Sequence, residues 1–252
     1  MVVLHKKERK SLELKHINIH SRVTLNELAQ LMNVSEDTIR RDILELAAEN
    51  KITRIKGGAM ALGNQYIPKK DSVGFEVEKK QIIAKKALGL LKEGMLVLIG
   101  GGTTIHELIN IIPDNFKATF VTANPFTSIQ LLEKPNLETI ILGGRISNYS
   151  QTVIGGDAFL KLAEIKADLS IMGTNAIDVE AGVTDLEWDS VEIKKAIFRS
   201  SKKVAILAIS EKLNTKMNLR VCGINEIDYL ITELDPKEAE LKAYQESGIQ
   251  IL

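Results

Sequence analysis

The stretch that decides the fold of the first part of the chain is Val34-Ser35-Glu36-Asp37-Thr38-Ile39-Arg40-Arg41-Asp42-Ile43-Leu44-Glu45-Leu46. Apolar residues recur in it at helical spacing, and the positions predicted to form one buried face are Ile39, Ile43 and Leu46. Ser35 stands directly before this pattern, where an N-cap belongs. Arg40 and Arg41 fall on or near the opposite side. The helix would therefore be anchored on one face and present two adjacent arginines on the other.

The residues before this helix indicate a helix-turn-helix. Thr24-Leu25-Asn26-Glu27 is a Thr-x-x-Glu capping box, which predicts a short helix that starts at Leu25. Asn33-Val34 then leaves only a tight turn before Ser35. Two short helices, a tight turn and arginines on the second helix are the pattern of a motif whose second helix lies in the major groove of DNA.

At this point the sequence resembles a known family. Ser35-x-x-Thr38-Ile39-Arg40-Arg41-Asp42 is similar to the signature of the DeoR family of bacterial transcription regulators, and the run from Leu46 to Ala59 resembles that family's wing with its closing Gly-Gly-Ala. We expect contacts to DNA bases or phosphates from Ser35, Thr38, Arg40, Arg41, Arg54 and Lys56. The alternative for the two adjacent arginines is a solvated, charged helix face. Asp42 projects toward the buried side, and we expect it to pair with an arginine.

Length and charge fit this interpretation. The chain has 252 residues, enough for two domains, and a formal net charge of zero. Through Leu62 there are eleven Lys/Arg against eight Asp/Glu, a mild positive excess that suits DNA contact. Four basic residues stand near the start of the chain, namely Lys6, Lys7, Arg9 and Lys10. They either contact DNA phosphates or belong to a solvated terminus.

The cysteine content and hydropathy exclude several classes of protein. A single cysteine, Cys222, excludes an internal disulfide and a multi-cysteine metal site, and its apolar neighbours suggest a buried thiol. No run approaches the about 18 apolar residues of a membrane helix, and no apolar segment follows the first charges as a secretion signal requires. We expect a cytoplasmic protein with no membrane partner, no metal and no cofactor.

The chain divides into a winged helix-turn-helix domain at residues 1–62, a linker at 63–75 and an α/β domain at 76–252. Apolar runs typical of strands buried on both faces are Met95–Ile99, Ala118–Thr122, Thr139–Leu142, Leu169–Met172, Val204–Leu207 and Tyr229–Ile231. Helical patterns lie between most of them. This alternation predicts a parallel, doubly wound sheet with its ligand crevice at the carboxyl ends of the strands.

A glycine-rich turn follows the first of these runs. Gly100-Gly101-Gly102-Thr103-Thr104 precedes a predicted helix, and such a turn lets backbone N–H groups and the helix N-terminus face an anion. The turn lacks the lysine of a Walker loop, and Ile105 stands where a dinucleotide fingerprint has its last glycine. The alternative is that the segment is only a turn.

Residues 80–233 resemble the effector domain of the same family, which is similar to ribose-5-phosphate isomerase and typically senses a phosphorylated sugar or related metabolite. The glycine turn and the resemblance together give the expected effector-binding residues Gly101, Gly102, Thr103, Thr104, Asn124, Lys194 and Lys212. The family usually carries aspartate at the positions of Gly100 and Ile209. Two carboxylates that could hold sugar hydroxyls are therefore absent. We expect either a less hydroxylated phosphorylated effector or a sensor that no longer responds.

The predicted function is that of a bacterial transcription regulator, and more specifically a repressor of a carbohydrate-metabolism operon. The resemblance implies operator DNA, a phosphorylated small molecule and a homo-oligomer, dimer or tetramer, as its partners. The rival prediction is an isomerase-like enzyme, which would need a carboxylate base. The carboxylates expected near the crevice are Asp185, Glu187 and Glu192, with Glu192 the candidate base. Catalysis would leave the DNA-binding half unexplained, so we expect no enzyme.

Overall fold

A computed structural model describes residues 5–20, 22–62 and 75–252. The chain forms two compact units, Met1–Phe75 and Glu76–Leu252, and each has its own hydrophobic core. The linker predicted at 63–75 lies outside the described residues, apart from Phe75. None of the helices in the described ranges is long and apolar enough to cross a membrane.

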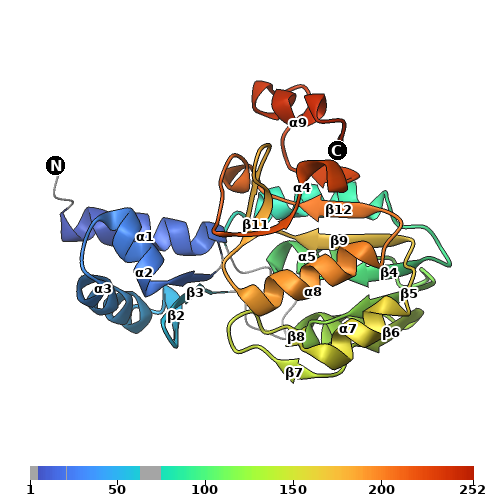
Figure 1. Cartoon of the computed structure of the whole chain (residues 1–252), viewed down its shortest axis with the longest axis horizontal. Helices are drawn as coiled ribbons and strands as arrows, with labels where there is room; N and C mark the ends of the chain where they lie inside the picture. Colours follow the sequence, from blue (N-terminus) through green and yellow to red (C-terminus); the bar gives the residue numbers. More distant parts are fainter. Residues whose placement is uncertain (1–4, 21, 63–74) are drawn as a thin grey trace. The chain divides into compact units, whose positions relative to one another are not determined.

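The N-terminal unit is a winged helix-turn-helix. Its helices and strands are α1 (Lys6–His20), β1 (Arg22–Thr24), α2 (Leu25–Met32), α3 (Glu36–Ala48), β2 (Ile52–Ile55) and β3 (Gly58–Ala61) (Figure 1). The strands form an antiparallel sheet in the order β1-β3-β2, in which β2 and β3 are the wing. The predicted motif is confirmed. Strand β1 was not predicted, because three residues are too few to show a period of two.

Local hydrogen bonds explain where the two helices of the motif begin. The Thr24 hydroxyl accepts from the Glu27 N–H at 3.1 Å, and the Glu27 carboxylate accepts from the Thr24 N–H at 3.3 Å. Asn33 then ends α2 in the left-handed conformation, with φ of 52°. Ser35 caps α3 by accepting from the Thr38 N–H at 3.3 Å. The predicted capping box and N-cap are thus both confirmed.

The buried face of α3 anchors the helix in the core of the N-terminal unit. Ile39, Ile43 and Leu46 are at most 1% exposed. Burial of each such side chain contributes roughly 1.5–3 kcal/mol to folding. They pack with residues of α1, α2 and the sheet, which include Ile17, Val23, Leu28, Ile52 and Ala59. The opposite face of α3 is thereby held outward.

The C-terminal unit is built on a seven-stranded sheet in the order β15-β14-β12-β9-β4-β5-β6. All neighbouring pairs in it are parallel. Its strands are β4 (Leu96–Ile99), β5 (Ala118–Thr122), β6 (Leu137–Ile141), β9 (Leu169–Gly173), β12 (Val204–Leu207), β14 (Tyr229–Ile231) and β15 (Gln250–Ile251). The middle strands β12, β9, β4, β5 and β6 follow one another down Figure 1. The predicted parallel sheet is confirmed, and only its two-residue edge strand β15 was missed.

The strand order fixes where a ligand crevice lies. Along the chain the sheet grows from β4 to β5 and β6 on one side, and then from β9 to β12, β14 and β15 on the other. The order therefore reverses between β4 and β9. In open parallel sheets with such a reversal, the chain segments that leave the two strands diverge, and ligands bind at the carboxyl ends of the strands there. We call this place the sheet crevice, and the glycine turn at 100–104 leaves β4 directly into it.

Helices and short strands complete the unit. The helices are α4 (Val77–Leu88), α5 (Thr103–Ile111), α6 (Pro125–Leu131), α7 (Gly156–Ala163), α8 (Trp188–Arg199) and α9 (Lys242–Glu246). Helices α4 and α6 pack on α5, and α7 packs on α8. A second sheet has the order β10-β11-β13, formed by Ala176–Asp178, Gly182–Asp185 and Leu219–Cys222. Strands β7 (Arg145–Ile146) and β8 (Val153–Ile154) form a hairpin. These small antiparallel pairings were not predicted.

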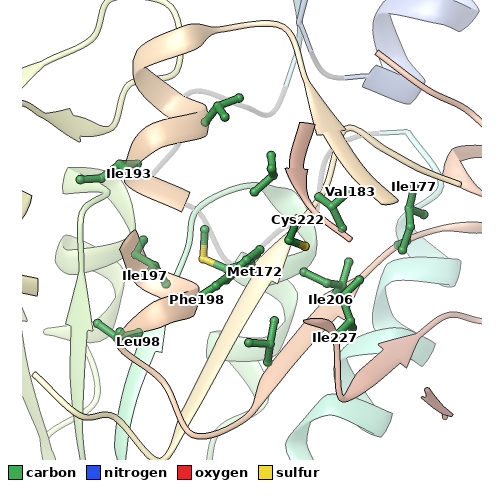
Figure 2. Packing of buried hydrophobic residues seen from close by; sticks show 14 of the residues in the cluster. Leu98, Met172, Ile177, Val183, Ile193, Ile197, Phe198, Ile206, Cys222 and Ile227 are labelled. Atoms are coloured by element: carbon green, nitrogen blue, oxygen red, sulfur yellow. The ribbon is translucent and has the colours of Figure 1, made fainter. Parts of the chain in front are cut away.

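The core of this unit joins the two sheets through α8. Figure 2 shows Met172 of β9, Val183 of β11 and Cys222 of β13 within one apolar cluster. The predicted burial of the cysteine is confirmed, because Cys222 is 5% exposed. Burial raises the pKa of its thiol to about 12, so the sulfur is an inert core group at neutral pH.

Candidate functional site

The outward face of α3 carries the residues predicted to contact DNA. Ser35 and Arg40 are exposed, and Thr38 is partly exposed. The hydroxyls of Ser35 and Thr38 lie 3.0 Å apart, so each is partly engaged by the other at the helix N-terminus. Arg40 donates to the Asp37 carboxylate at 2.7 Å. Asp37 therefore orients this guanidinium along the helix surface.

Arg41 differs from its neighbour. Its side chain is exposed and forms no hydrogen bond or ion pair with any of the described residues. The same face carries Leu44, which is 45% exposed and offers an apolar surface beside the arginine. An unpaired guanidinium next to an apolar contact matches what a guanine edge and a thymine methyl group require in the major groove.

Asp42 faces inward, as predicted, and its partner is Arg9 of α1. The Arg9 Nε donates to the Asp42 carboxylate at 2.6 Å, and Asp42 is 1% exposed. Arg9 is thus used inside the unit, and only 12% of its side chain is exposed for a phosphate contact. Lys6 and Lys10 also have carboxylate partners, Glu45 at 2.5 Å and Glu49 at 2.7 Å respectively. These pairs tie α1 to α3 and fix the orientation of the recognition helix.

The wing holds Arg54 and Lys56 outward. Both side chains are exposed, on β2 and in the turn that follows it. Gly57 has a φ of 77°, which side chains rarely tolerate, and a Cβ on Gly58 would lie 2.0 Å from the Val23 carbonyl oxygen. The two glycines are therefore required by the turn and by its close approach to β1. They place both cations at one end of the wing.

In the C-terminal unit, the glycine turn gives α5 an open N-terminus. Gly102 has a φ of 105° and precedes Thr103 without any side-chain cap, so no side chain of the N-cap residue accepts from the first N–H groups of α5. A Cβ on Gly101 would lie 2.4 Å from the Asn124 amide nitrogen. The turn and the end of β5 are thus in direct contact, and the site requires glycine for that contact.

Asn124 lies at the predicted place, but most of its carboxamide is already engaged. Its oxygen accepts from the Thr127 N–H at 3.0 Å as the N-cap of α6, and its nitrogen donates to the Gln151 carbonyl at 3.3 Å. The residue is 8% exposed. Asn124 therefore positions the glycine turn against the β7–β8 hairpin.

The predicted lysines lie in different electrostatic surroundings. Lys194 of α8 pairs with the buried Asp185 at the end of β11. Lys212 donates to the Thr174 carbonyl after β9 at 2.6 Å, and no carboxylate among the described residues forms an ion pair with it. Burial and the positive charges of Lys80 and Lys194 lower the pKa of Lys212 to about 7. Such a group is stabilised by an anion.

A third lysine, Lys80 of α4, lies near these two. It is 7% exposed, and burial lowers its pKa to about 8. We call Lys80, Lys194 and Lys212 the lysine cluster. The sequence did not single out Lys80, because it belongs to an ordinary amphipathic helix and only the tertiary fold brings it beside Lys212.

The two positions that lack the usual aspartate have their space filled by apolar groups. A Cβ on Gly100 would lie 2.7 Å from the Met172 sulfur, so this side chain occupies the volume of any residue at 100. Ile209 is 2% exposed and belongs to the core. Carboxylates nearby come instead from Glu211 and Glu233, and Lys79 of α4 pairs with both.

The carboxylates of the enzyme hypothesis are also engaged. Asp185 holds Lys194, and Glu192 pairs with Lys195 one helical turn away at 2.8 Å. Glu187 accepts from the Ser147 hydroxyl, and its second oxygen is buried without a hydrogen-bond partner among the described residues. The candidate base Glu192 is therefore an ion-paired helix residue.

Comparison with known proteins decides the family. A model described as the DeoR C-terminal sensor domain matches residues 76–234, and a model described as the DeoR-like helix-turn-helix domain matches residues 9–65. The chain belongs to the DeoR family. It is a DNA-binding transcription regulator with a C-terminal sensor domain. The predicted family, fold and regulator class are confirmed.

Relatives of this DeoR-family chain extend over most of its length. The HTH-type transcriptional regulator GlpR of Haloferax volcanii is 30% identical over 83% of this chain and 83% of its own length. The glycerol-3-phosphate regulon repressor of Escherichia coli is 26% identical over 91% of each chain. Among solved structures, ribose 5-phosphate isomerase A of Neisseria gonorrhoeae covers 55% of this chain and 54% of its own, with 18% identity and a TM-score of 0.42.

Proposed function

We propose that this DeoR-family chain is a repressor of a carbohydrate-metabolism operon, which binds its operator through α3 and the wing. The support in the N-terminal unit is the unpaired, exposed Arg41 beside Leu44, with Arg54 and Lys56 held outward on the wing. Ser35, Thr38 and Arg40 complete the contact surface. A relative that carries the name of a repressor supports the direction of regulation.

The effector in this proposal is a phosphorylated small molecule bound in the sheet crevice. The observation that carries it is Lys212, a cation at the crevice with a lowered pKa and no carboxylate partner among the described residues. A phosphate bound here would accept from the open N-terminus of α5 at Thr103 and Thr104, and would restore the charge of Lys212. Gly101 and Gly102 would allow the phosphate to approach the backbone closely, while Asn124 and Lys194 would position the residues around it.

The rest of the effector would have few hydroxyl groups to be recognised. Met172 and Ile209 fill the places of two carboxylates, and apolar groups cannot accept hydrogen bonds from a sugar. Asp185 and Glu211 are the carboxylates whose charges act on Lys212, and they already pair with Lys194 and Lys79 respectively. We therefore propose a short phosphorylated polyol or acid in preference to an intact hexose phosphate.

Regulation would work through a dimer or tetramer that binds paired half-sites in cytoplasmic DNA. A single winged helix-turn-helix contacts few base pairs, so two modules are needed for an affinity useful in a genome. An effector that binds one arrangement of the oligomer better than another shifts the population between them. A coupling of about 1–3 kcal/mol would change operator affinity roughly 5- to 150-fold. This role is regulatory and involves no catalysis.

The test is a thermal-shift screen of the full chain against glycerol phosphates, sugar phosphates and inorganic phosphate. A ligand at 100 times its Kd should stabilise the chain by about 2.7 kcal/mol. Lys212→Gln should abolish the shift. Lys237→Gln removes the same charge from an exposed residue and should leave the shift intact. The active ligand should also change binding to an operator selected in vitro.

Two outcomes would contradict the proposal in different ways. No shift with any phosphorylated compound, in a chain that still binds DNA, would mean that the sensor is silent. A shift that Lys212→Gln leaves unchanged would place the effector elsewhere.

A further inference from the structure

A second concave site lies away from the glycine turn, between the C-terminal half of α8 and β13. It is a pocket of about 340 Å³, lined by residues of α8, β12 and β13. This volume is at the small end of the range of metabolite-binding pockets. Its apolar lining includes Phe198, Val221 and Cys222, which are at most 9% exposed. Figure 2 shows Phe198 and Cys222 in the cluster that forms this floor.

Two arginines from different elements line the same pocket. Arg199 comes from the last turn of α8 and Arg220 from β13. Neither guanidinium forms a hydrogen bond or ion pair with any residue in the described ranges. Favourable interaction with the end of a helix explains a cation at Arg199. It does not explain Arg220, whose strand has no such dipole.

The guanidinium of Arg220 lies against the backbone of a turn. Its Nη2 lies 2.6 Å from where a Cβ on Gly223 would be, so the guanidinium rests on the backbone of this glycine. Glu226 also lines the pocket, but its carboxylate accepts from the Gly223 N–H at 2.6 Å. Lys195, a third cation of the lining, is paired with Glu192 at 2.8 Å. The two arginines therefore remain available to a ligand.

We propose that this pocket, which we call the arginine pocket, binds a small organic anion with an apolar body and a phosphate or carboxylate head. The head would lie between Arg199 and Arg220, whose planar donors suit bidentate contact with either group. The body would lie on Phe198 and Val221. An inorganic ion would leave this apolar floor uncovered, so the site favours an organic anion over free phosphate.

The arginine pocket shares structural elements with the sheet crevice. Lys194 of the lysine cluster and Lys195 of the pocket are consecutive on α8. On β13, Leu219 pairs with Asp185, the partner of Lys194, and Arg220 pairs with Thr184. An anion in the arginine pocket therefore contacts the helix and the sheet that hold Lys194. The pocket is placed to act as a second input to the sensor domain.

The test is isothermal titration calorimetry of the full chain with phenyl phosphate, benzoate and inorganic phosphate as probes. Phenyl phosphate should bind more tightly than inorganic phosphate, because only it covers the floor. Arg199→Gln/Arg220→Gln should weaken phenyl phosphate binding at least roughly tenfold, since a hydrogen bond to a charged group is worth about that factor or more. Circular dichroism should show that this variant, altered at two exposed residues, keeps its fold.

Two control variants separate this site from others. Lys212→Gln, which alters the lysine cluster, should leave phenyl phosphate binding unchanged, so failure of the proposed effector site and failure of the arginine pocket are distinguishable. Lys166→Gln/Lys237→Gln removes two exposed charges elsewhere on the same unit and should also have no effect. The proposal is overturned if wild-type protein binds no organic anion at millimolar concentration. It is equally overturned if the arginine variant binds as tightly as wild type, or if the distant lysine variant loses as much affinity.

Discussion

A buried carboxyl group in the DNA-binding unit gives a prediction that can be worked through in numbers. Glu13 of α1 is 0% exposed, and neither of its oxygens accepts a hydrogen bond from a donor in the described residues. Its neighbours are Asp42 of α3 and Arg9, whose Nε lies 3.6 Å from Glu13 and 2.6 Å from Asp42. One guanidinium faces two carboxyl groups. A proton on Glu13 removes the repulsion between the two carboxyl groups and lets Glu13 donate a hydrogen bond to Asp42.

The pKa of Glu13 reflects this arrangement. Burial and the adjacent negative charge of Asp42 raise it from 4.5 to about 8, while Arg9 and Lys10 oppose the shift. The folded state therefore binds this proton more tightly than the unfolded state between those two values. Stability from this group is complete below pH 4.5 and is lost as the pH rises toward about 8.

The expected slope is at most about 1.4 kcal/mol per pH unit, which sums to at most about 5 kcal/mol over the interval. Glu13→Gln keeps the shape and can donate its amide N–H to Asp42 without titrating. It should remove the slope. Near pH 5 the variant should be about as stable as wild type, and at pH 8 it should be more stable by up to the same total.

The measurement is the opening free energy of α3 from amide hydrogen exchange in the full chain, between pH 5 and pH 8.5. Exchange reports local stability and so avoids assuming that both units unfold together. Glu8→Gln, an exposed carboxylate on the same helix, is the matched control and should follow wild type. Equal pH slopes in wild type and Glu13→Gln would refute the reasoning, because Glu13 would then be ionised or solvated in the folded state.

Three further predictions concern the effector site, the DNA-binding surface and the ion pair between Asp185 and Lys194. Effector affinity should be greatest between about pH 6, where a phosphate gains its second charge, and about pH 7, the pKa of Lys212, and it should fall at higher pH by up to about tenfold per unit. Calorimetry with the effector at several pH values measures this, and constant affinity up to pH 9 would exclude a role for the Lys212 ammonium. Arg41→Ala should weaken binding to the selected operator by about 1–3 kcal/mol and relax the base preference at one position, whereas Lys56→Ala should weaken binding to all sequences alike and reduce the slope of log affinity against log salt concentration by about one. Fluorescence anisotropy at several salt concentrations distinguishes the two variants, and identical behaviour would contradict the assignment. Asp185→Asn should destabilise the C-terminal unit by about 3–5 kcal/mol, because Lys194 would keep a partly buried charge without its partner. Urea unfolding followed by Trp188 fluorescence measures this free energy of unfolding, and a loss below 1 kcal/mol would show that the pair is dispensable.

Short-range chemistry explains why most of the N-terminal unit could be predicted. A capping box needs only Thr24 and Glu27, and the recognition helix needs only Ser35 and an apolar repeat, so each signal is complete within a few residues. The exposed positions of Arg41 and Lys56 could be predicted for the same reason, because both residues lie on local elements. Glu13 was not found, since its burial depends on Asp42, which is 29 residues further along the chain.

In the sensor unit, the sequence could place strands but not the contents of the crevice. The glycine turn after β4 and the lysine at 212 are local features. Their relation to Lys80 is not, because α4 reaches Lys212 only through the fold. Asn124 shows the converse limit. It lies where the family pattern puts it, yet most of its hydrogen-bonding capacity goes to α6 and Gln151.

The sequence by itself determined the two domain types, the recognition helix, the order of the strands along the chain and the glycine turn after the first strand of the large sheet. These follow from periodicity, caps and glycine, which act over one or two turns of chain. The tertiary structure alone decided the strand order in the sheet, and with it the crevice between β4 and β9. It also decided which charges remain without partners. Arg9 and Lys194 pair with carboxylates across the fold, whereas Lys212, Arg199 and Arg220 have no carboxylate partner in the described residues. The sequence could not show this difference, because an ion pair depends on distance in space and the sequence specifies only distance along the chain.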